Sequence, residues 1–182
     1  MILRTERLVL RPFMEEDAPR LAALAGTRRV ADTTASIPHP YSPGQALGEI
    51  RRFQAELQSG SSAHFVFALA ESEEWFGEVL LKLIDTVHSQ AELGFWIDAA
   101  SGGKGYVTEA SGAALRYAFG PLALNRINAH SMVRNQASAK VLTRLGFHHE
   151  GVLRERVRKW GVFEDVDAWS LLRGDPESAP YR

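Results

Sequence analysis

Hydrophobic residues change their spacing near the middle of the chain. From Ala91 to Ile97 they alternate with polar or small residues, and this period of two predicts a strand. From Val107 to Phe119 they recur every three or four residues, which predicts a helix that stops at Gly120 and Pro121. A glycine-rich turn joins the two, so a strand, a turn and a helix follow one another at the centre of the sequence.

The same two periods assign elements to the rest of the chain. Strands are expected at Leu3 to Phe13, Ala63 to Ala70, Trp75 to Asp85, Asn125 to Val133, Phe147 to Lys159 and Phe163 to Leu172. Helices are expected at Glu15 to Ala25, from the capping box at Ser42 to Gly60, and from the Asn135 cap to Leu145. The four residues Glu71 to Glu74 predict a hairpin turn, and the strands on either side of it form an antiparallel meander with the Ala91 strand.

Two stretches lack such a period. Ala31 to Tyr41 carries Pro38 and Pro40 and predicts a loop over one side of a cleft. Asp175 to Arg182 predicts a frayed tail. Because no repeat, low-complexity tract or linker interrupts the sequence, we expect one mixed α/β domain over residues 1–175 and a tail over residues 176–182.

Composition narrows the class of protein. The chain has 182 residues, of which 45% are apolar and 24% are charged, as is typical of one soluble globular domain. Its 21 basic and 22 acidic residues give a net charge of −1, so we expect no nucleic-acid partner. Apolar runs stay below the roughly 18 residues of a membrane span, and the N-terminus lacks the apolar core of a signal peptide. We therefore expect a cytoplasmic protein without a membrane partner.

Cysteine and histidine usage limits the chemistry. The chain has no cysteine, which excludes disulfides, thiolate metal sites and a cysteine nucleophile. The six histidines lack metal-ligand spacing such as H-E-x-x-H, and His148 and His149 fit alternate faces of a strand. We therefore expect no metal.

The glycine-rich turn is the first candidate site. Gly102, Gly103 and Gly105 surround Lys104 just ahead of the helix. Glycines there let bare N–H groups converge, the helix dipole adds positive potential, and the lysine adds a full charge, which together favour phosphate oxygens. The alternative is a tight turn that only reverses the chain. A P-loop is excluded because Gly105 follows Lys104, and the glycines do not fit G-x-G-x-x-G.

The sequence of this turn resembles that of a known family. Gly103-Lys104-Gly105-Tyr106-Val107-Thr108-Glu109-Ala110 is similar to the pyrophosphate loop of the GNAT superfamily of N-acetyltransferases, in the ribosomal-protein-alanine acetyltransferase (RimJ/RimL-like) branch. The similarity covers nearly the whole chain, with further matches in the family's order and spacing at residues 3–12, 91–97, 125–127, 135–138, 145–147, 150–151 and 153–154.

This resemblance implies a GNAT fold, an α/β (α+β) architecture in which a mixed, mostly antiparallel sheet is splayed into a V after Phe95 and flanked by helices. Acetyl-coenzyme A, the cosubstrate, would lie in the V. Strand backbone would pair with the pantetheine amides, and the glycine turn would hold the pyrophosphate. The coenzyme-binding residues that the resemblance implies are Phe95, Trp96, Ile97, Gly102, Gly103, Lys104, Gly105, Tyr106, Val107, Thr108, Asn135 and Ser138.

Acetyl transfer would need a neutral amine, a stabilised oxyanion and a proton for the leaving thiolate. In the family, a hydroxyl at the position of Ser138 lies near the thioester sulfur and can protonate the thiolate, and the residue at Asn135 approaches the pantetheine arm. A strand amide near Trp96 would stabilise the oxyanion. The alternatives are a simple helix cap for Asn135 and a solvated first-turn serine for Ser138.

The general base is where the sequence departs from the family pattern. Val157 stands where some relatives carry a glutamate that faces the acceptor. Glu155 lies two residues earlier, on the same face if the strand is regular, so it is the substitute candidate and Glu92 is the next. Either residue can equally be an ordinary solvated or ion-paired carboxylate.

A missing base favours an acceptor amine that loses its proton easily. An α-amine with a pKa of about 7.7 to 8.0 is roughly 10% neutral at pH 7, whereas a lysine amine with a pKa of about 10.4 is only about 0.04% neutral. The expected acceptor is therefore a protein N-terminal α-amine. The alternatives are a small-molecule amine, such as a polyamine or an antibiotic, and a non-catalytic acyl-coenzyme A sensor. Exposed aromatic residues such as Trp160 would be the contacts of a homodimer, if one forms.

Overall fold

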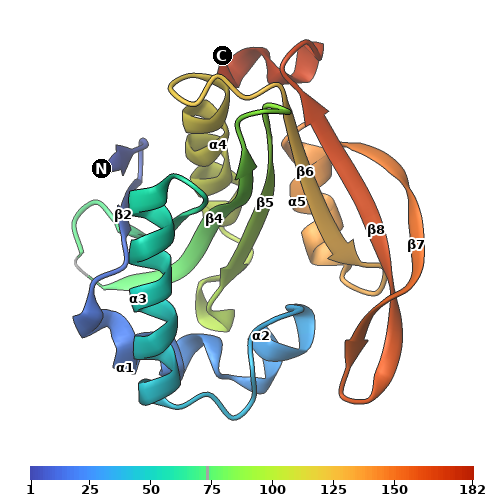
Figure 1. Ribbon diagram of the computed structural model, residues 1–182. Coiled ribbons are helices and arrows are strands. Elements are labelled where there is room, and N and C mark those ends of the chain that lie inside the picture. Colours follow the sequence, from blue (N-terminus) through green and yellow to red (C-terminus); the bar gives the residue numbers. More distant parts are fainter. Residues whose placement is uncertain (73) are drawn as a thin grey trace.

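An eight-stranded sheet runs through the molecule, and helices cover both of its faces (Figure 1). The computed structural model describes residues 1–72 and 74–182. The strand order is β1-β2-β3-β4-β5-β6-β8-β7, in which β5 and β6 are parallel and the other neighbours are antiparallel. The strands are β1 (Leu3–Arg4), β2 (Leu8–Pro12), β3 (Ala63–Leu69), β4 (Trp75–Asp85), β5 (Gln90–Ile97), β6 (Arg126–Met132), β7 (His148–Lys159) and β8 (Val162–Leu172). The predicted mixed, mostly antiparallel sheet is confirmed.

The α-helices begin and end largely where the sequence predicts. They are α1 (Ala18–Ala25), α2 (Arg28–Thr33), α3 (Pro43–Ser59), α4 (Tyr106–Phe119) and α5 (Gln136–Arg144), and three 3-10 helices are η1 (Glu15–Asp17), η2 (Ala99–Ser101) and η3 (Pro176–Tyr181). At the start of α3, the Ser42 hydroxyl accepts from the Gln45 N–H and the Gln45 side chain accepts in return from the Ser42 N–H. The same helix ends at Gly60, whose φ of 74° is left-handed. The predicted capping box and glycine stop are confirmed.

The strands divide their side chains between two cores because successive residues point to opposite faces. Phe65 belongs to the cluster beneath α4, together with Leu115, while its neighbour Val66 belongs to the cluster beneath α1 and α3, together with Ile50. Figure 1 shows α1 and α3 on one face of the sheet and α4 and α5 on the other. Both faces of the sheet are therefore buried against helices.

The sheet opens between its two parallel strands. In the part of the chain that the structure describes, β5 pairs with β6 only from Gln90 to Leu93, opposite residues 126–129. Beyond Leu93, β5 continues along β4 while β6 continues along β8. Figure 1 shows β5 and β6 diverging toward the side where α2 lies. The splay therefore begins after Leu93, two residues earlier than the predicted point after Phe95.

Three sequence predictions need correction. The predicted strand from Leu3 to Phe13 is two strands, β1 and β2, because the turn between them docks on α4 through Thr5 and Arg7, which both donate to Glu109. The predicted loop from Ala31 to Tyr41 begins inside α2, since the Thr27 hydroxyl caps that helix at the Val30 N–H.

The tail is ordered rather than frayed. It forms η3, where the buried Ser178 hydroxyl donates to the carbonyls of Arg173 and Asp175. Residue 73, inside the predicted hairpin turn of Glu71 to Glu74, lies outside the described residues, and the two strands that this turn joins pair as expected.

Candidate active site

A cavity of about 1390 Å³ occupies the opening between β5 and β6. One end, here called the glycine-turn end, is lined by residues of β5, of α5 and of the glycine-rich turn before α4. The other, here called the α2–α3 end, is lined by residues of α2, the following loop and α3. Pockets for one small ligand usually measure about 300–1,000 Å³, so this cavity is large enough to bind two reactants.

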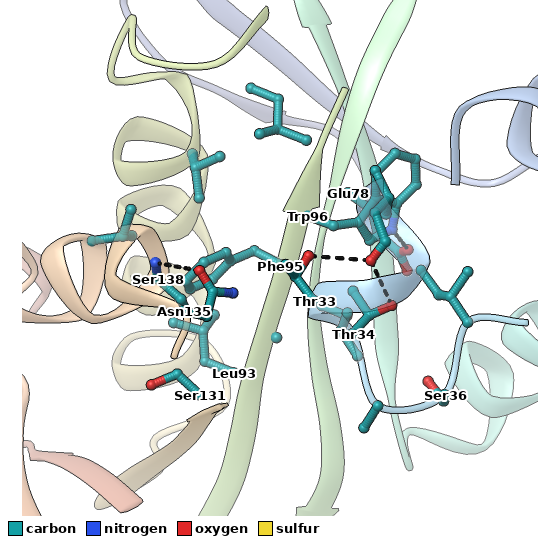
Figure 2. Close-up of a pocket in the computed structure, with 18 of the residues that line it drawn as sticks. Thr33, Thr34, Ser36, Glu78, Leu93, Phe95, Trp96, Ser131, Asn135 and Ser138 are labelled. Carbon is teal, nitrogen blue, oxygen red and sulfur yellow. Dashed lines mark hydrogen bonds between the residues drawn. The ribbon is translucent and has the colours of Figure 1, made fainter. Parts of the chain in front are cut away.

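The coenzyme residues predicted from the sequence converge on this cavity. Phe95, Trp96 and Ile97 pair with β4 along one edge, and among the described residues β6 does not pair with their other edge, which leaves that edge open to the cavity. Figure 2 shows Asn135 and Ser138 on one side of β5 and Glu78 and Trp96 on the other. All of the predicted coenzyme residues line the cavity except Lys104, which is exposed and lies outside the lining.

The glycine turn has the backbone conformation that its sequence predicts. Gly103 and Gly105 have φ angles of 79° and 80°, which side-chain-bearing residues rarely adopt. Gly105 is the N-cap of α4, and no side chain in the described chain caps the N–H groups that follow it. Arg7 braces the turn, because its guanidinium donates to the Lys104 carbonyl at 3.1 Å and pairs with Glu109. Bare N–H groups at a helix N-terminus are a suitable site for phosphate oxygens.

Asn135 and Ser138 stand at the start of α5. The Asn135 side-chain oxygen accepts from the Ser138 N–H at 3.2 Å, so the predicted helix cap is confirmed. Both residues are half-buried and line the cavity. The cap orients the Asn135 side chain and leaves its amide nitrogen and the Ser138 hydroxyl available to a ligand.

Glu155 does not reach the cavity. The pairing of β7 with β8 shifts between Leu153 and Val157, so the strand is irregular where Glu155 stands. Glu155 is exposed, has a φ of 51°, and donates its backbone N–H to the Asp165 carboxylate at 2.8 Å. The prediction that it shares a strand face with Val157 is therefore wrong, because the bulge turns it out of the lining while Val157 stays in it.

Glu92 lines the cavity but is already paired. Its carboxylate lies 2.8 Å from the Lys82 ammonium and 3.4 Å from His130. Burial alone would raise the pKa of Glu92, but hydrogen bonds from His130 and Lys82 outweigh it and hold the pKa below its usual value. Glu92 therefore fits the ion-paired alternative better than the role of a base.

Sequence reasoning missed two buried polar residues at the α2–α3 end, Glu78 and His64. Glu78 Oε1 lies 2.7 Å from His64 Nδ1, and Glu78 Oε2 accepts from Trp96 Nε1 at 2.6 Å. Both residues line the cavity and both side chains are less than a tenth exposed. The available signal was His64 within the otherwise apolar strand β3, and Glu78 directly before the apolar residues Val79, Leu80 and Leu81 of β4. Their contact depends on the register that places Val66 opposite Glu78, which strand patterning alone does not fix.

A second group of side chains closes the α2–α3 end against the last hairpin. Asp32 of α2 accepts from Arg134 at 2.7 Å and from Trp160 Nε1 at 2.7 Å. Nearby, Lys159 donates to the Ile37 carbonyl at 3.1 Å. Hydrogen bonds from Arg134 and Trp160 hold the pKa of Asp32 below its usual value. We call Asp32, Arg134 and Trp160 the Asp32 cluster. It gives Trp160 an intramolecular contact, and the expected homodimer stays a prediction.

Among the described residues, no group of three or more His, Cys, Asp or Glu side chains could hold a metal ion, and His149 instead pairs with Asp167 at 2.8 Å. No helix in the same residues is long and apolar enough to cross a membrane.

Comparison with known proteins agrees with this geometry. The acetyltransferase (GNAT) domain model matches residues 7–148. A putative ribosomal N-acetyltransferase of Bacillus subtilis (strain 168), YdaF, is 37% identical over 178 residues, which cover 94% of each chain. The ribosomal protein uS5-alanine N-acetyltransferase of Escherichia coli (strain K12) is 31% identical over 95% of this chain and 91% of its own.

Solved structures show the same fold. The RimL ribosomal L7/L12 α-N-protein acetyltransferase in complex with coenzyme A has a TM-score of 0.87 over 94% of this chain and 98% of its own, at 19% identity. The resemblance drawn from the glycine turn is thus confirmed along most of the sequence. The chain belongs to the GNAT family of N-acetyltransferases.

Proposed function

We propose that the protein transfers the acetyl group of acetyl-coenzyme A to the α-amine of a protein N-terminus. The observation that carries this proposal is one continuous cavity that joins an open strand edge and a bare helix N-terminus to a buried carboxylate, Glu78. Relatives named as ribosomal-protein N-acetyltransferases support the choice of a protein acceptor.

The residues at the glycine-turn end fit the cosubstrate. The open edge of β5 at Phe95 to Ile97 offers N–H and C=O groups to the pantetheine amides, as an added strand would. The backbone N–H groups from Gly103 to Val107 take the pyrophosphate at the N-terminus of α4. Exposed Lys104 contributes through long-range attraction rather than by lining the cavity.

The reaction joins the acceptor nitrogen to the thioester carbonyl carbon and breaks the carbon–sulfur bond. A backbone N–H near Trp96 stabilises the oxyanion, and the Ser138 hydroxyl gives a proton to the leaving thiolate. An acceptor that arrives as an ammonium loses two protons in all. One is matched by the proton that the thiolate gains, and the other leaves to solvent. A group that accepts a proton from the ammonium is therefore required.

Glu78 is the group best placed to take that proton. It stands directly opposite Trp96 in the pairing of β4 with β5, one strand away from the open edge. Adjacent strands lie about 4.8 Å apart, so its carboxylate reaches an amine at that edge directly or through one water. Glu155 and Glu92 are less suitable, because the first lies outside the cavity and the second is paired with Lys82.

Thiol release from acetyl-coenzyme A tests the proposal. The substrates are a lysine-free peptide with a free N-terminus, an N-terminally blocked peptide with one lysine, and spermidine. The protein has no cysteine, so a thiol-reactive dye reports only coenzyme A. We expect the α-amino peptide to be fastest. Faster release with the lysine peptide or with spermidine would overturn the acceptor, and no release with any amine would favour a sensor.

Ser138→Ala is the first variant to measure with the best acceptor. Loss of a proton donor lowers kcat by about 10² while the Kd for acetyl-coenzyme A stays within about twofold of wild type. An unchanged kcat would return Ser138 to the role of a solvated first-turn serine.

A further inference from the structure

His64 is held inside the protein by contacts on three sides. Its Nδ1 lies 2.7 Å from Glu78 Oε1, and its Nε2 lies 3.6 Å from Glu56 Oε2 on α3. Its ring stacks on Phe53, with the ring centroids 3.8 Å apart and the planes at 11°. The side chain is 8% exposed. Strand β3, which carries His64, supplies none of the residues assigned to the coenzyme, so this buried histidine has another role.

The contact with Glu78 fixes which ring nitrogen carries the proton. An ionised carboxylate only accepts hydrogen bonds, so at 2.7 Å His64 Nδ1 must be the donor. The second oxygen of Glu78 accepts from Trp96 Nε1 at 2.6 Å. Both carboxylate oxygens are therefore held by N–H donors from the two neighbouring strands. Hydrogen bonds to an ionised carboxylate favour the ionised form over the protonated form.

We propose that His64 is a positioning residue that holds the Glu78 carboxylate in the orientation in which it takes the proton of the acceptor amine, an inference that rests on the proposed function. His64 acts through Glu78 and touches neither reactant. The groups that face this pair are Trp96 from β5, Glu56 from α3 and Tyr41 from the loop before α3, and Glu56 is itself paired with Arg52 at 2.5 Å. Glu56 lies on the Nε2 side of the ring and so does not compete for Nδ1. Burial, with the nearby carboxylates of Glu49 and Glu78, raises the pKa of Tyr41 to about 12, so Tyr41 stays neutral.

Two substitutions separate positioning from packing. His64→Leu removes the donor, whereas His64→Asn can place an amide N–H near the former position of Nδ1. We expect His64→Leu to lower kcat by about 10- to 100-fold, since a hydrogen bond to a charged group contributes about 1.5–3 kcal/mol. The acceptor KM and the Kd for acetyl-coenzyme A stay within about twofold. His64→Asn restores most of the lost kcat.

His149→Leu is the matched control. His149 makes a histidine–carboxylate contact of similar length, 2.8 Å to Asp167, but it is exposed and lies outside the cavity. We expect wild-type kinetics for this variant. The proposal is overturned if His64→Leu keeps the wild-type kcat. It is also overturned if a folded His64→Asn is as slow as His64→Leu.

Nitrogen-15 NMR of the histidine rings gives a readout that does not depend on activity. We expect a proton on Nδ1 of His64 in the free protein near pH 7.5, and its loss or shift in Glu78→Ala. A ring protonated only on Nε2 would overturn the pairing even in an active enzyme. A proton on Nδ1 together with no thiol release from any amine would instead contradict the proposed function and leave the pairing intact.

Discussion

The two ends of the cavity are built from different kinds of groups. At the glycine-turn end, the groups assigned to the coenzyme are mostly main chain from residues 95–107, together with the Asn135 and Ser138 side chains of α5. At the α2–α3 end, the polar groups in the lining are side chains from different strands, Glu78 of β4 against His64 of β3, and the Asp32 cluster packs beside that end without lining it. A main-chain site depends on local backbone conformation, whereas a side-chain site depends on how remote elements pack. Substitutions should therefore affect coenzyme binding and acceptor turnover separately.

The largest expected loss of activity comes from substitution of Glu78, which lies at the α2–α3 end of the cavity. Glu78→Gln removes the proton acceptor and lowers kcat by about 10² to 10⁴, the usual contribution of general base catalysis. The Kd for acetyl-coenzyme A, measured by calorimetry, stays within about twofold because the substitution keeps a side-chain oxygen for Trp96 Nε1 and leaves the backbone edge of β5 unchanged. Comparable losses in kcat and coenzyme affinity would mean that the two ends are not separate.

The next largest effect is expected at the glycine-turn end, where substitutions of two neighbouring glycines can be compared. Gly103→Ala places a side chain at a φ of 79°, and its new Cβ meets no atom within 4 Å, so the change acts through backbone conformation alone. A left-handed alanine costs about 1–2 kcal/mol, so the free turn relaxes and the Kd for acetyl-coenzyme A rises about tenfold. Under saturating coenzyme, kcat is nearly unchanged.

Gly102→Ala is the control for this substitution. Gly102 has a φ of −64°, and a Cβ there meets its nearest atom, the Ala99 carbonyl oxygen, at an ordinary 3.5 Å. We expect wild-type coenzyme affinity. Equal losses of affinity in the two variants would show that the turn is sensitive to side-chain bulk rather than to backbone conformation.

The same difference explains what could be predicted from the sequence. The strand, the glycine turn and the α5 cap at Asn135 are local patterns, and each lies where the sequence places it. The Glu78–His64 contact depends on strand register, and the Asp32 cluster joins residues more than 100 positions apart. Glu155 is a candidate base only if its strand is regular, and the bulge in β7 makes the strand irregular at that residue. Long-range packing decides these features, and periodicity carries no information about it.

A smaller effect is expected where the Asp32 cluster closes the α2–α3 end. Asp32→Asn keeps an oxygen for Trp160 but replaces the ion pair with Arg134 by a weaker contact. Both side chains are more than a third exposed, so the pair is screened by solvent and contributes about 0.2–1 kcal/mol. We expect the acceptor KM to rise up to about fivefold and to lose part of its dependence on salt. The Kd for acetyl-coenzyme A is the internal control, and an unchanged acceptor KM would show that the cluster does not shape this end.

The smallest effect concerns Glu109, which holds Arg7 against the glycine turn. Burial would raise the pKa of Glu109, but hydrogen bonds from the Thr5 hydroxyl and from Arg7 outweigh it and hold the pKa below its usual value. A lowered native pKa means that the charged form stabilises the fold above the unfolded pKa of about 4.3, and that this contribution is lost as pH falls through the native value.

Glu109→Gln should therefore lower the free energy of unfolding by about 1 kcal/mol at pH 7, a modest value because Arg7 is 44% exposed. In urea unfolding, the difference from wild type should shrink as pH falls below about 4.3. The Kd for acetyl-coenzyme A should change less than about twofold, because Arg7 still donates to the Lys104 carbonyl and the glycines keep their conformation. If coenzyme binding were lost instead, the glycine-turn end would depend on a remote side-chain contact as much as the α2–α3 end does, and the contrast between the two would disappear.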